Sequence, residues 1–401
     1  MRILHLYKAY PPVWGGIEGN VELLARGQAK RGHEVTVLTT VDGDDSESLE
    51  DGVRVLRCRR LLELRSTPFS WSWIRRLLGE RPDVAHLHMP YPFGSLTQLL
   101  AGRSRTTVVT YHCDIVKQRY LGALYRPLQR SVLRRVDRIL VTNPRLSASS
   151  PVLTGLGGPD RRTVVPLGIE LAANPDLDAA SALPEAELPK DLPTEPFVLF
   201  VGRFRHYKGL PYLLRAMAEL PARHAVLVGD GPLRPELEQL VDHLGLRGRV
   251  LFVGSVDEAT KQALYRRAAL LVLPSVDRSE AFGLVLVEAM AAGLPVVSTE
   301  VGTGTSWVNV DGVTGFVVPP RDPQRLAGTV ETLLGDDELR RELGRNARQR
   351  AESELDAELM IERTLKVYAE VLEAAGPGGE GPAAPSRSSS TAPSPSSSSL
   401  S

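Results

Sequence analysis

Short runs of Val, Ile and Leu alternate with longer amphipathic patterns along the chain, and no other feature limits its fold as strongly. Helices are predicted between several of the runs, as at 17–31 and 118–135. Almost continuously apolar strands separated by helices predict a parallel sheet that is covered on both faces. The strands predicted in the first part of the chain are 3–6, 35–39, 53–58, 84–87, 107–111, 139–141 and 164–166.

The alternation stops at 172–196 and then starts again. This stretch is rich in proline and acidic residues and holds few apolar runs, so we interpret it as a linker between two domains. The strands predicted after it are 197–201, 225–228, 250–253, 270–273, 296–298 and 316–318. The fold class is therefore α/β, with two Rossmann-like, doubly wound parallel-sheet domains that face each other across a cleft, where ligands are favoured.

The domain boundaries follow from these changes in pattern. We expect an N-terminal domain at 1–171, the linker at 172–196 and a C-terminal domain at 197–353, which includes a helix at 326–334. A closing helix is predicted at 354–374. The remainder, 375–401, consists mainly of Ser, Pro, Gly and Ala, so it cannot bury enough apolar surface to offset the entropy of ordering.

Charge and cysteine content limit the partners and the compartment. Lys plus Arg and Asp plus Glu both total 48, which gives no global reason to expect nucleic-acid binding. Cys58 and Cys113 lie far apart, so a disulfide framework is not expected and a reducing cytoplasm is favoured. No secretory signal or membrane-spanning run is visible. We expect a cytoplasmic protein, with peripheral contact at the inner face of a membrane left open.

Two glutamates give the strongest functional signal. Ser279–Gly283 reads SEAFG, and Glu288 follows eight positions after Glu280. We expect Glu280 at the start of a helix and Glu288 about two turns into it, on roughly the same face. Free backbone N–H groups at a helix start bind phosphate oxygens, and a carboxylate accepts hydrogen bonds from sugar hydroxyls. The alternative is a dipole-favoured residue followed by a solvated one.

Two cations follow the strand predicted at 197–201. Gly202 and Arg203 follow it, and Lys208, five positions after Arg203, is followed by Gly209. A guanidinium and an ammonium group at the carboxyl end of a strand suit a diphosphate, whose charge they would stabilise as the sugar leaves. The alternative is an exposed basic loop.

Two further candidates follow strands of the first domain. Gly15 and Gly16 come after the first strand and open a helix, where the backbone can approach a phosphate. They lack the spacing of a dinucleotide site. His112 follows the strand at 107–111, where a lone histidine is also often structural. No His or Cys spacing suggests zinc, and no Asp-x-Asp pair suggests a divalent ion, so we expect no metal.

Taken together and in order, these motifs resemble the retaining GT-B glycosyltransferases of family GT4, over most of residues 1–374. The stretches at 302–309, 312–315, 86–90 and 114–116 resemble the subgroup that includes polysaccharide mannosyltransferases. The motifs that carry the family resemblance are GGIE at 15–18, TYHCD at 110–114, PLGIE at 166–170, GR-x4-KG at 202–209, GDGP at 229–232, PS at 274–275 and E-AFG-x4-E-A at 280–289.

The resemblance implies a role for each matching residue. Arg203 and Lys208 would bind the donor diphosphate, and His112 would contact the transferred sugar near the reacting carbon. Glu280 would hold sugar hydroxyls, and Glu288 would bind the ribose. The remaining donor-binding positions are backbone amides at Gly15, Gly16, Ala281, Phe282 and Gly283, with Val256 in the loop that holds the base.

The resemblance also implies chemistry. It implies retention of anomeric configuration without a metal ion, with the departing phosphate helping to deprotonate the acceptor. His88 and Asp114 are the candidate acceptor contacts. Cys113 stands where the subgroup leads us to expect Ser, which makes a stronger hydrogen bond, so acceptor orientation would differ.

A repeat of arginines suggests a surface for a lipid-linked acceptor. Arg126, Arg130, Arg134 and Arg138 recur every four residues; the first three form a stripe on the helix predicted at 118–135, and Arg138 lies just beyond it. A separate apolar stripe on this helix is marked by Leu121, Leu124, Leu128 and Val132. A basic helix face can attract anionic lipid or a lipid diphosphate. The alternative is an ordinary solvated face.

The sequence thus predicts transfer of a hexose, with mannose from GDP-mannose favoured, to a glycan or lipid-linked saccharide. It predicts no separate cofactor and no nucleic-acid partner. Two alternatives stay open: a GT-B sugar phosphorylase or nucleotide-sugar epimerase, and a non-catalytic nucleotide-sugar-binding protein.

Overall fold

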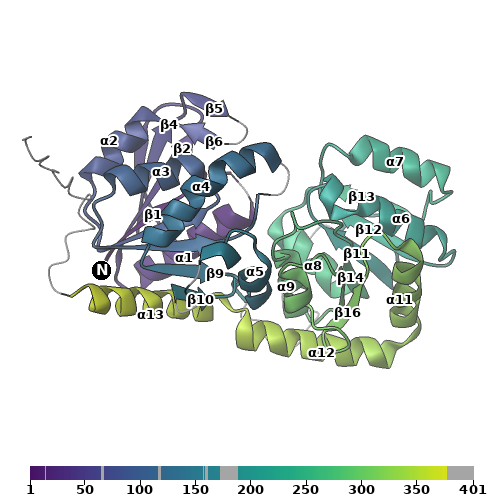
Figure 1. Cartoon of the computed structure of the whole chain (residues 1–401). Helices are drawn as coiled ribbons and strands as arrows, with labels where there is room; N and C mark the ends of the chain where they lie inside the picture. Colours follow the sequence, from purple (N-terminus) through teal and green to yellow (C-terminus); the bar gives the residue numbers. More distant parts are fainter. Residues whose placement is uncertain are drawn as a thin grey trace, which may run out of the picture.

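The computed structural model describes residues 1–13, 15–64, 67–115, 119–156, 158, 161–171 and 188–376. Two α/β units stand side by side, each with helices around a central sheet (Figure 1). The predicted linker is described only from residue 188 and the predicted tail only to residue 376, so the rest of both predictions lies outside the described residues.

The first unit is built on an eight-stranded sheet in the order β10-β9-β8-β7-β1-β2-β4-β3. Its strands are parallel except for the outer β3, which pairs antiparallel with β4. A separate hairpin, β5-β6, lies beside it. The strands are β1 (Arg2–Leu6), β2 (Glu34–Val41), β3 (Ser46–Glu50), β4 (Val53–Arg59), β5 (Leu62–Leu64), β6 (Thr67–Phe69), β7 (Val84–Met89), β8 (Thr106–Tyr111), β9 (Arg138–Val141) and β10 (Arg162–Val164).

Side-chain caps mark where several helices of this unit begin. The Ser70 hydroxyl caps α2, and the Asn143 side chain caps α5 just before a proline. Each cap satisfies a backbone N–H that has no partner within the helix. The helices are α1 (Gly16–Lys30), α2 (Trp71–Gly79), α3 (Pro92–Ala101), α4 (Arg119–Arg135), α5 (Pro144–Ser149) and the short 3-10 helix η1 (Thr154–Leu156).

The second unit has a six-stranded parallel sheet in the order β13-β12-β11-β14-β15-β16. This is the doubly wound arrangement, in which the strand order reverses beside the first strand. The strands are β11 (Phe197–Val201), β12 (His224–Val228), β13 (Val250–Gly254), β14 (Leu270–Leu273), β15 (Val296–Thr299) and β16 (Gly315–Val318).

Aspartates cap several helices of the second unit. Asp257 caps α8, Asp322 caps α11 and Asp336 caps α12, each accepting a hydrogen bond from a backbone N–H three residues on. The helices are η3 (His206–Lys208), α6 (Leu210–Ala218), α7 (Arg234–His243), α8 (Glu258–Arg267), α9 (Leu284–Ala291), α10 (Thr305–Val308), α11 (Pro323–Gly335) and α12 (Asp337–Glu354).

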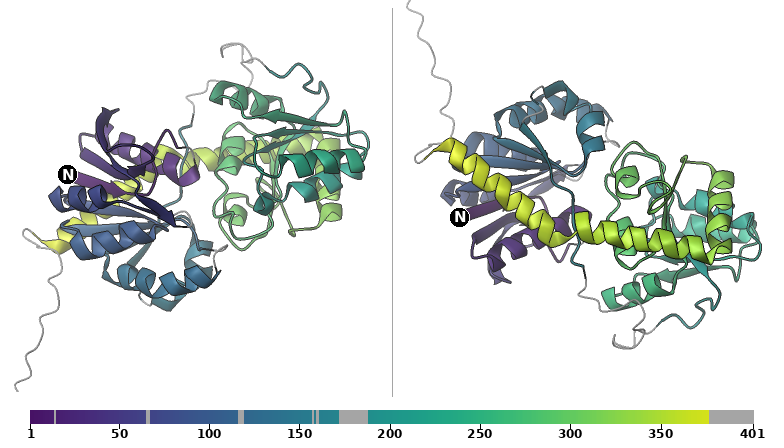
Figure 2. Two further views of the ribbon diagram at one scale, coloured as in Figure 1. Left: turned by 90° about the horizontal axis from the view of Figure 1, so that it is seen from above. Right: turned by 90° about the horizontal axis from the view of Figure 1, so that it is seen from below.

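The last helix returns to the first unit. Helix α13 (Ala357–Ala375) packs on α1 and β8, whereas α12 packs on α9. Both helices run end to end along one side of the molecule (Figure 2). Between them, Ile169 donates a hydrogen bond to Leu355 and accepts one from Ala357. The chain therefore crosses between the units a second time at 355–357.

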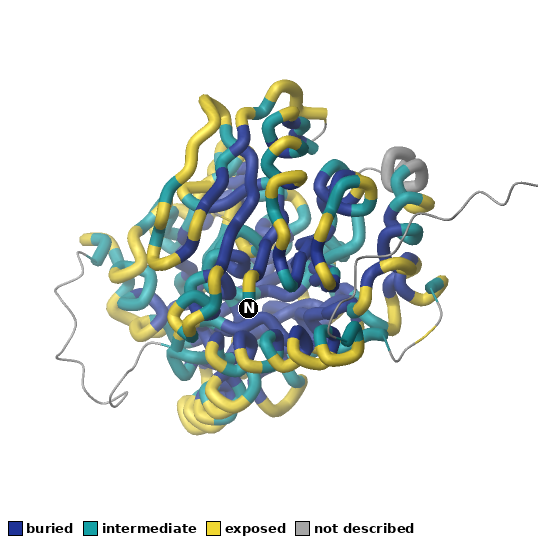
Figure 3. Tube along the Cα trace, turned by 90° about the vertical axis from the view of Figure 1, so that its left-hand side faces the viewer, coloured by how far each residue is buried: buried dark blue, intermediate teal, exposed yellow. Residues whose placement is uncertain are grey.

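The buried residues follow the strands, and the outer faces of the helices are exposed (Figure 3). The predicted α/β class with two Rossmann-like sheets is confirmed. The sequence analysis missed β3, the β5-β6 hairpin and α12, and it placed one helix at 354–374 where α12 ends and α13 begins. Both cysteines are unpaired, and no helix among the described residues has the length and apolar character needed to cross a membrane.

Candidate active site

The strand order of the second sheet directs attention to one edge. The order reverses between β11 and β14, so the loops that follow these strands lie next to each other at the carboxyl ends. Doubly wound sheets bind ligands at such a point. The first loop carries Arg203 and Lys208, and the second carries Glu280.

Lys208 and Glu280 form a buried ion pair at this edge. The Lys208 Nζ lies 2.6 Å from Glu280 Oε2, and the two residues are only 9% and 7% exposed. The Ser275 hydroxyl donates to the same carboxylate at 3.1 Å. Burial lowers the pKa of Lys208, but the adjacent Glu280 carboxylate outweighs burial and the net shift is upward. The lysine is therefore a buried cation in the neutral range.

Close backbone packing brings the two loops together. Gly209 has a left-handed φ of 71°, and a Cβ atom there would collide with the carbonyl oxygen of Pro274. One step away, the Val276 N–H donates to the Tyr207 carbonyl at 2.8 Å. The glycine that follows the lysine in the sequence motif thus lets the lysine reach the glutamate.

The predicted position of Glu280 was wrong. Helix α9 begins at Leu284, after a left-handed Gly283, so Glu280 lies in the preceding loop and shares no helix face with Glu288. Glu288 is in the second turn of α9, as predicted. Its carboxylate accepts a hydrogen bond from the Tyr265 hydroxyl at 2.7 Å and lies 3.0 Å from Lys261 Nζ.

The loop between Glu280 and α9 contains two backbone N–H groups that form no hydrogen bond among the described residues. Ala281 is held through its carbonyl, which accepts from the Gly304 N–H at 2.9 Å, and the buried Phe282 ring packs near Trp307. Within the described part of the chain, the N–H groups of Phe282 and Gly283 have no hydrogen-bond partner. They are suited to bind an anion or a hydroxyl beside the glutamate.

Arg203 lines a hollow of about 570 Å³ with Gly229–Pro232 and Ser255. The arginine is exposed, and the neighbouring Gly202 backbone lies against the Lys208 side chain. Val256, half-buried, follows directly in the loop before α8. The GDGP turn therefore adjoins the predicted cation Arg203.

A cavity of about 390 Å³ lies between the two units and joins predicted residues of both. Gly15 and Gly16, at the start of α1, share it with Glu288 of α9. Asn20, which the sequence analysis missed, also lines it, and its buried Oδ1 has no hydrogen-bond partner among the described residues. No local motif marks Asn20; its burial was the missing signal. The predicted cleft between the units is thus present.

His112 sits at the end of β8 in a network of buried histidines. Its Nε2 lies 3.1 Å from His88 Nδ1, and His88 Nε2 lies 3.0 Å from His5 Nδ1. Burial lowers the pKa of His112 to about 3 and that of His5 to about 4. His88 is fully enclosed and reaches the site through His112 in this structure.

Three buried histidines, one of them His86 on β7, are close enough to suggest a metal site. Ring nitrogens of His5, His86 and His88 lie within 4.8 Å of one another. The sequence analysis found no such group because the residues come from two strands paired only in the fold. Every ring nitrogen of the three histidines already has a hydrogen-bond partner, so hydrogen bonds account for the close approach of the three rings.

Asp114, a predicted acceptor contact, is tied to the other unit. Its carboxylate accepts from the Tyr111 and Ser150 hydroxyls at 2.8 and 2.6 Å. Its second oxygen lies 3.3 Å from the Arg278 guanidinium, which belongs to the loop that carries Glu280. Cys113 directly precedes Asp114, and burial raises the pKa of its thiol to about 11.

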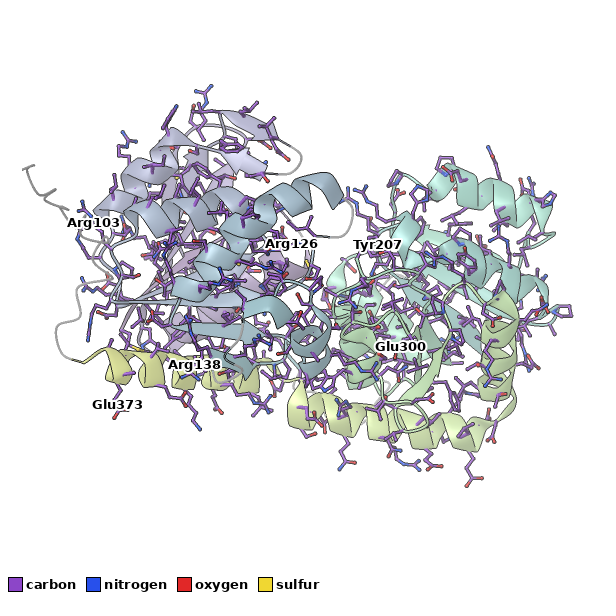
Figure 4. All side chains as sticks on the ribbon, in the orientation of Figure 1. Arg103, Arg126, Arg138, Tyr207, Glu300 and Glu373 are labelled. Atoms are coloured by element: carbon purple, nitrogen blue, oxygen red, sulfur yellow. The ribbon has the colours of Figure 1, made fainter. Side chains whose placement is uncertain are left out.

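The three arginines predicted to form a stripe on α4 are not all exposed, which corrects that prediction. Arg126 and Arg134 are exposed, but Arg130 donates to the Pro151 carbonyl at 3.2 Å. Arg138 lies on β9 and pairs with Glu370 of α13. Figure 4 labels Arg126 on α4 and Arg138 near α13, on different sides of the first unit. The predicted apolar positions 121 and 124 lie outside the residues whose side chains are described.

The chain matches two protein families. Residues 15–168 match the family described as "Glycosyl transferase 4-like domain", and residues 186–350 match "Glycosyl transferases group 1". The chain is 37% identical over 377 residues to the O-antigen chain mannosyltransferase C of Escherichia coli, covering 93% of this chain and 99% of that protein. It is 38% identical over 356 residues to the D-rhamnosyltransferase WbpZ of Pseudomonas aeruginosa, covering 87% and 91%.

Solved structures share the architecture. The sucrose-phosphate synthase from Thermosynechococcus elongatus aligns with a TM-score of 0.75 and 26% identity, covering 93% of this chain and 99% of that chain. HepE of Anabaena, solved in complex with UDP-glucose, aligns with a TM-score of 0.71 and 22% identity, covering 92% and 100%, which bears on the fold alone.

Proposed function

Because the chain belongs to the GT-B glycosyltransferases of family GT4, we propose that it moves a hexose from a nucleotide-diphosphate donor to a glycan or lipid-linked acceptor. Mannose from GDP-mannose is the favoured donor, and the reaction retains anomeric configuration without a metal ion. The observation that carries this proposal is the buried Lys208–Glu280 pair where the order of the second sheet reverses. The pair places a cation that can bind a phosphate directly beside a carboxylate that can accept hydrogen bonds from sugar hydroxyls.

Each member of the pair has a separate task in this proposal. The ammonium group of Lys208, with Arg203, takes the diphosphate and stabilises the charge that develops as the sugar leaves. Glu280 accepts hydrogen bonds from sugar hydroxyls, and the N–H groups of Phe282 and Gly283 donate to the same sugar. Glu288 holds the ribose, and the loop at Val256 holds the base. The amides of Gly15 and Gly16 complete the diphosphate site from the first unit.

The choice of mannose rests on the relatives. One is named a mannosyltransferase and one a rhamnosyltransferase, and mannose and rhamnose are both six-carbon sugars. His112 contacts the transferred sugar from the first unit. Asp114 faces the acceptor, and its ion pair with Arg278 exchanges for acceptor hydroxyls when the acceptor binds.

A thermal-shift series with GDP-, UDP- and ADP-sugars ranks the donors without an acceptor. A ligand that binds only the folded protein raises its stability by mass action, by about 2.7 kcal/mol at a hundredfold excess over Kd. We expect the largest shift with GDP-mannose. An equal, negligible shift with every nucleotide sugar would contradict the donor proposal.

Two further measurements address the reaction itself. The anomeric configuration of the transferred sugar, read by NMR from its one-bond C–H coupling, should match that of the donor. Turnover should persist after EDTA treatment. Inversion at the anomeric carbon, or loss of turnover that added Mg²⁺ restores, would contradict these two parts of the proposal separately.

A further inference from the structure

A chain of buried hydrogen bonds runs from His112 to helix α1 and branches there. His112, His88 and His5 are linked in that order, and His5 Nε2 then lies 2.8 Å from Gln28 Oε1. Gln28 is fully buried on α1. His112 Nδ1, at the other end, is buried and has no hydrogen-bond partner among the described residues.

A second arm leaves the same glutamine. Gln28 Nε2 donates to the Tyr368 hydroxyl of α13 at 3.5 Å, and that hydroxyl lies 2.5 Å from His86 Nδ1. His86 Nε2 then lies 2.7 Å from the Thr110 hydroxyl. The glutamine thus has its oxygen on one arm and its nitrogen on the other.

Each imidazole in these arms carries one proton. Burial holds the pKa of all four histidines below the usual 6.5, to about 4 at His5 and about 3 at His112. A neutral imidazole has one N–H donor and one bare nitrogen acceptor. A hydrogen bond at one ring nitrogen therefore dictates what the other nitrogen can do.

The protons of the first arm can be assigned from Gln28 outward. An amide oxygen only accepts, so His5 Nε2 carries the proton and His5 Nδ1 is bare. His88 Nε2 must then donate to His5, which leaves His88 Nδ1 bare. His112 Nε2 must donate to His88 Nδ1, and His112 Nδ1 is left as an acceptor without a proton.

The second arm agrees with the same orientation of the amide. Gln28 Nε2 only donates, so the Tyr368 hydroxyl accepts from it and donates its own proton to His86 Nδ1. His86 Nε2 then carries a proton and donates to Thr110. All the ring nitrogens of the four histidines are then paired except His112 Nδ1, whose lone pair has no partner among the described residues.

We propose that Gln28 is a positioning residue that sets the tautomer of His112, so that Nδ1 is a bare acceptor for a hydroxyl of the transferred sugar. The role toward the sugar rests on the proposed function; the tautomer does not. The opposite amide orientation would reverse every proton and leave a buried N–H at Nδ1 without a partner, at a cost in stability.

Histidine NMR on the full-length protein tests the tautomer without any substrate. Two-bond ¹H–¹⁵N spectra of ¹⁵N-histidine-labelled protein distinguish a protonated Nε2 from a protonated Nδ1, and a His112→Asn variant assigns the signals. We expect wild-type His112 to be protonated on Nε2 alone. A proton on Nδ1, or a bound transition metal replacing the network, would overturn the proposal.

Three variants separate the glutamine from general packing. Gln28→Met removes the hydrogen bonds that link this position to both arms, so it should give a mixture of His112 tautomers. Tyr368→Phe removes one hydroxyl from the second arm at the same depth and should leave His112 unchanged. Gln28→Glu keeps an oxygen acceptor for His5 and should preserve the wild-type tautomer, even if Gln28→Met fails to fold.

Donor kinetics connect the tautomer to the sugar. In Gln28→Met the KM for the donor should rise by about tenfold, the scale of one lost hydrogen bond, with kcat little changed. Tyr368→Phe and Gln28→Glu should retain the wild-type KM. A shifted tautomer with an unchanged KM would remove the sugar contact, whereas an absence of any transfer in the wild type would fault the proposed function and leave the tautomer result standing.

Discussion

At the scale of single residues, the site depends on charges that are costly to bury alone. Removing one partner of a buried ion pair leaves the other charge uncompensated, which commonly costs more than losing the pair. Lys208 and Glu280 fit this case, because both side chains are about nine-tenths enclosed and only 2.6 Å separates their charged atoms. Loss of activity in a single variant would therefore mix loss of chemistry with loss of stability.

The first prediction separates these effects. Lys208→Met should lower the free energy of unfolding by about 3 to 5 kcal/mol, because it leaves the Glu280 carboxylate buried and unpaired. The double variant Lys208→Met/Glu280→Gln should recover to within about 2 kcal/mol of wild type, because no buried charge remains. Urea unfolding of the variants measures both. If the losses of unfolding free energy measured for Lys208→Met alone and for Glu280→Gln alone simply added in the double variant, the two residues would not be coupled.

The second prediction concerns the loss of folding stability at acidic pH. His5 and His112 have folded-state pKa values of about 4 and 3, below the unfolded value of 6.5, because burial disfavours their charged forms. Below pH 6.5 the unfolded chain takes up protons that the folded chain refuses, so stability present above pH 6.5 is lost as the pH falls toward 4. Each such histidine should contribute a slope of up to about 1.4 kcal/mol per pH unit.

Urea unfolding between pH 7 and pH 5 measures this slope. His86 and His88 add to it, because burial and the neighbouring histidines hold both pKa values well below 6.5. A free energy of unfolding that stays flat across this range would show that the network is protonated or solvated in the folded protein.

At the scale of helices and strands, α12 is fixed to the second unit by a close backbone contact. Gly344 is buried, and a Cβ atom there would collide with the carbonyl oxygen of Gly293, just after α9. Gly328 on the neighbouring α11 is exposed and has nothing within 4 Å of an added Cβ. The two helical glycines therefore form a matched pair.

The third prediction uses this pair. Gly344→Ala should lower the melting temperature, with a loss of about 1 to 3 kcal/mol, because backbone must shift to admit the methyl group. Gly328→Ala should stabilise the protein by about 0.5 to 1 kcal/mol through helix propensity. Calorimetry of both variants measures this difference, and a harmless Gly344→Ala would mean that α12 does not pack as described.

The sequence predicted elements whose pattern is local. The strands that precede the site residues are continuous apolar runs, and His112, Lys208 and Glu280 all follow such strands. Helix α12 was missed although Asp336 caps it and apolar residues recur every four positions, because its charged residues mask the pattern. Its apolar positions are Leu339, Leu343, Ala347 and Ala351.

Contacts between distant segments were beyond the sequence. The pairing of β1 with β7 brings His5 beside His86, and α13 supplies Tyr368 from the far end of the chain. Nothing local in the sequence marks Gln28 as the link between them. Glu280 was placed on a helix because its loop precedes an apolar pattern, and only the left-handed Gly283 shows where α9 begins.

At the scale of the whole molecule, the two units are joined by more than one passage of the chain. The segment at 355–357 crosses between them, and ion pairs link Asp114 to Arg278 and Arg145 to Glu300. The Arg145–Glu300 pair is exposed and is worth little, on the order of 0 to 1 kcal/mol, whereas the Asp114 side chain of the other pair is largely buried.

The central claim is that a nucleotide sugar binds between the units on the Lys208–Glu280 pair. Calorimetric titration of the nucleotide sugar that ranks first by thermal shift, into wild type and into Lys208→Met/Glu280→Gln, tests it most directly, because the double variant should stay folded. We predict saturable binding to wild type and at least about a tenfold loss in the double variant, since each charge-assisted contact is worth roughly 1.5 to 3 kcal/mol. Equal affinities in the two folded proteins would contradict the account.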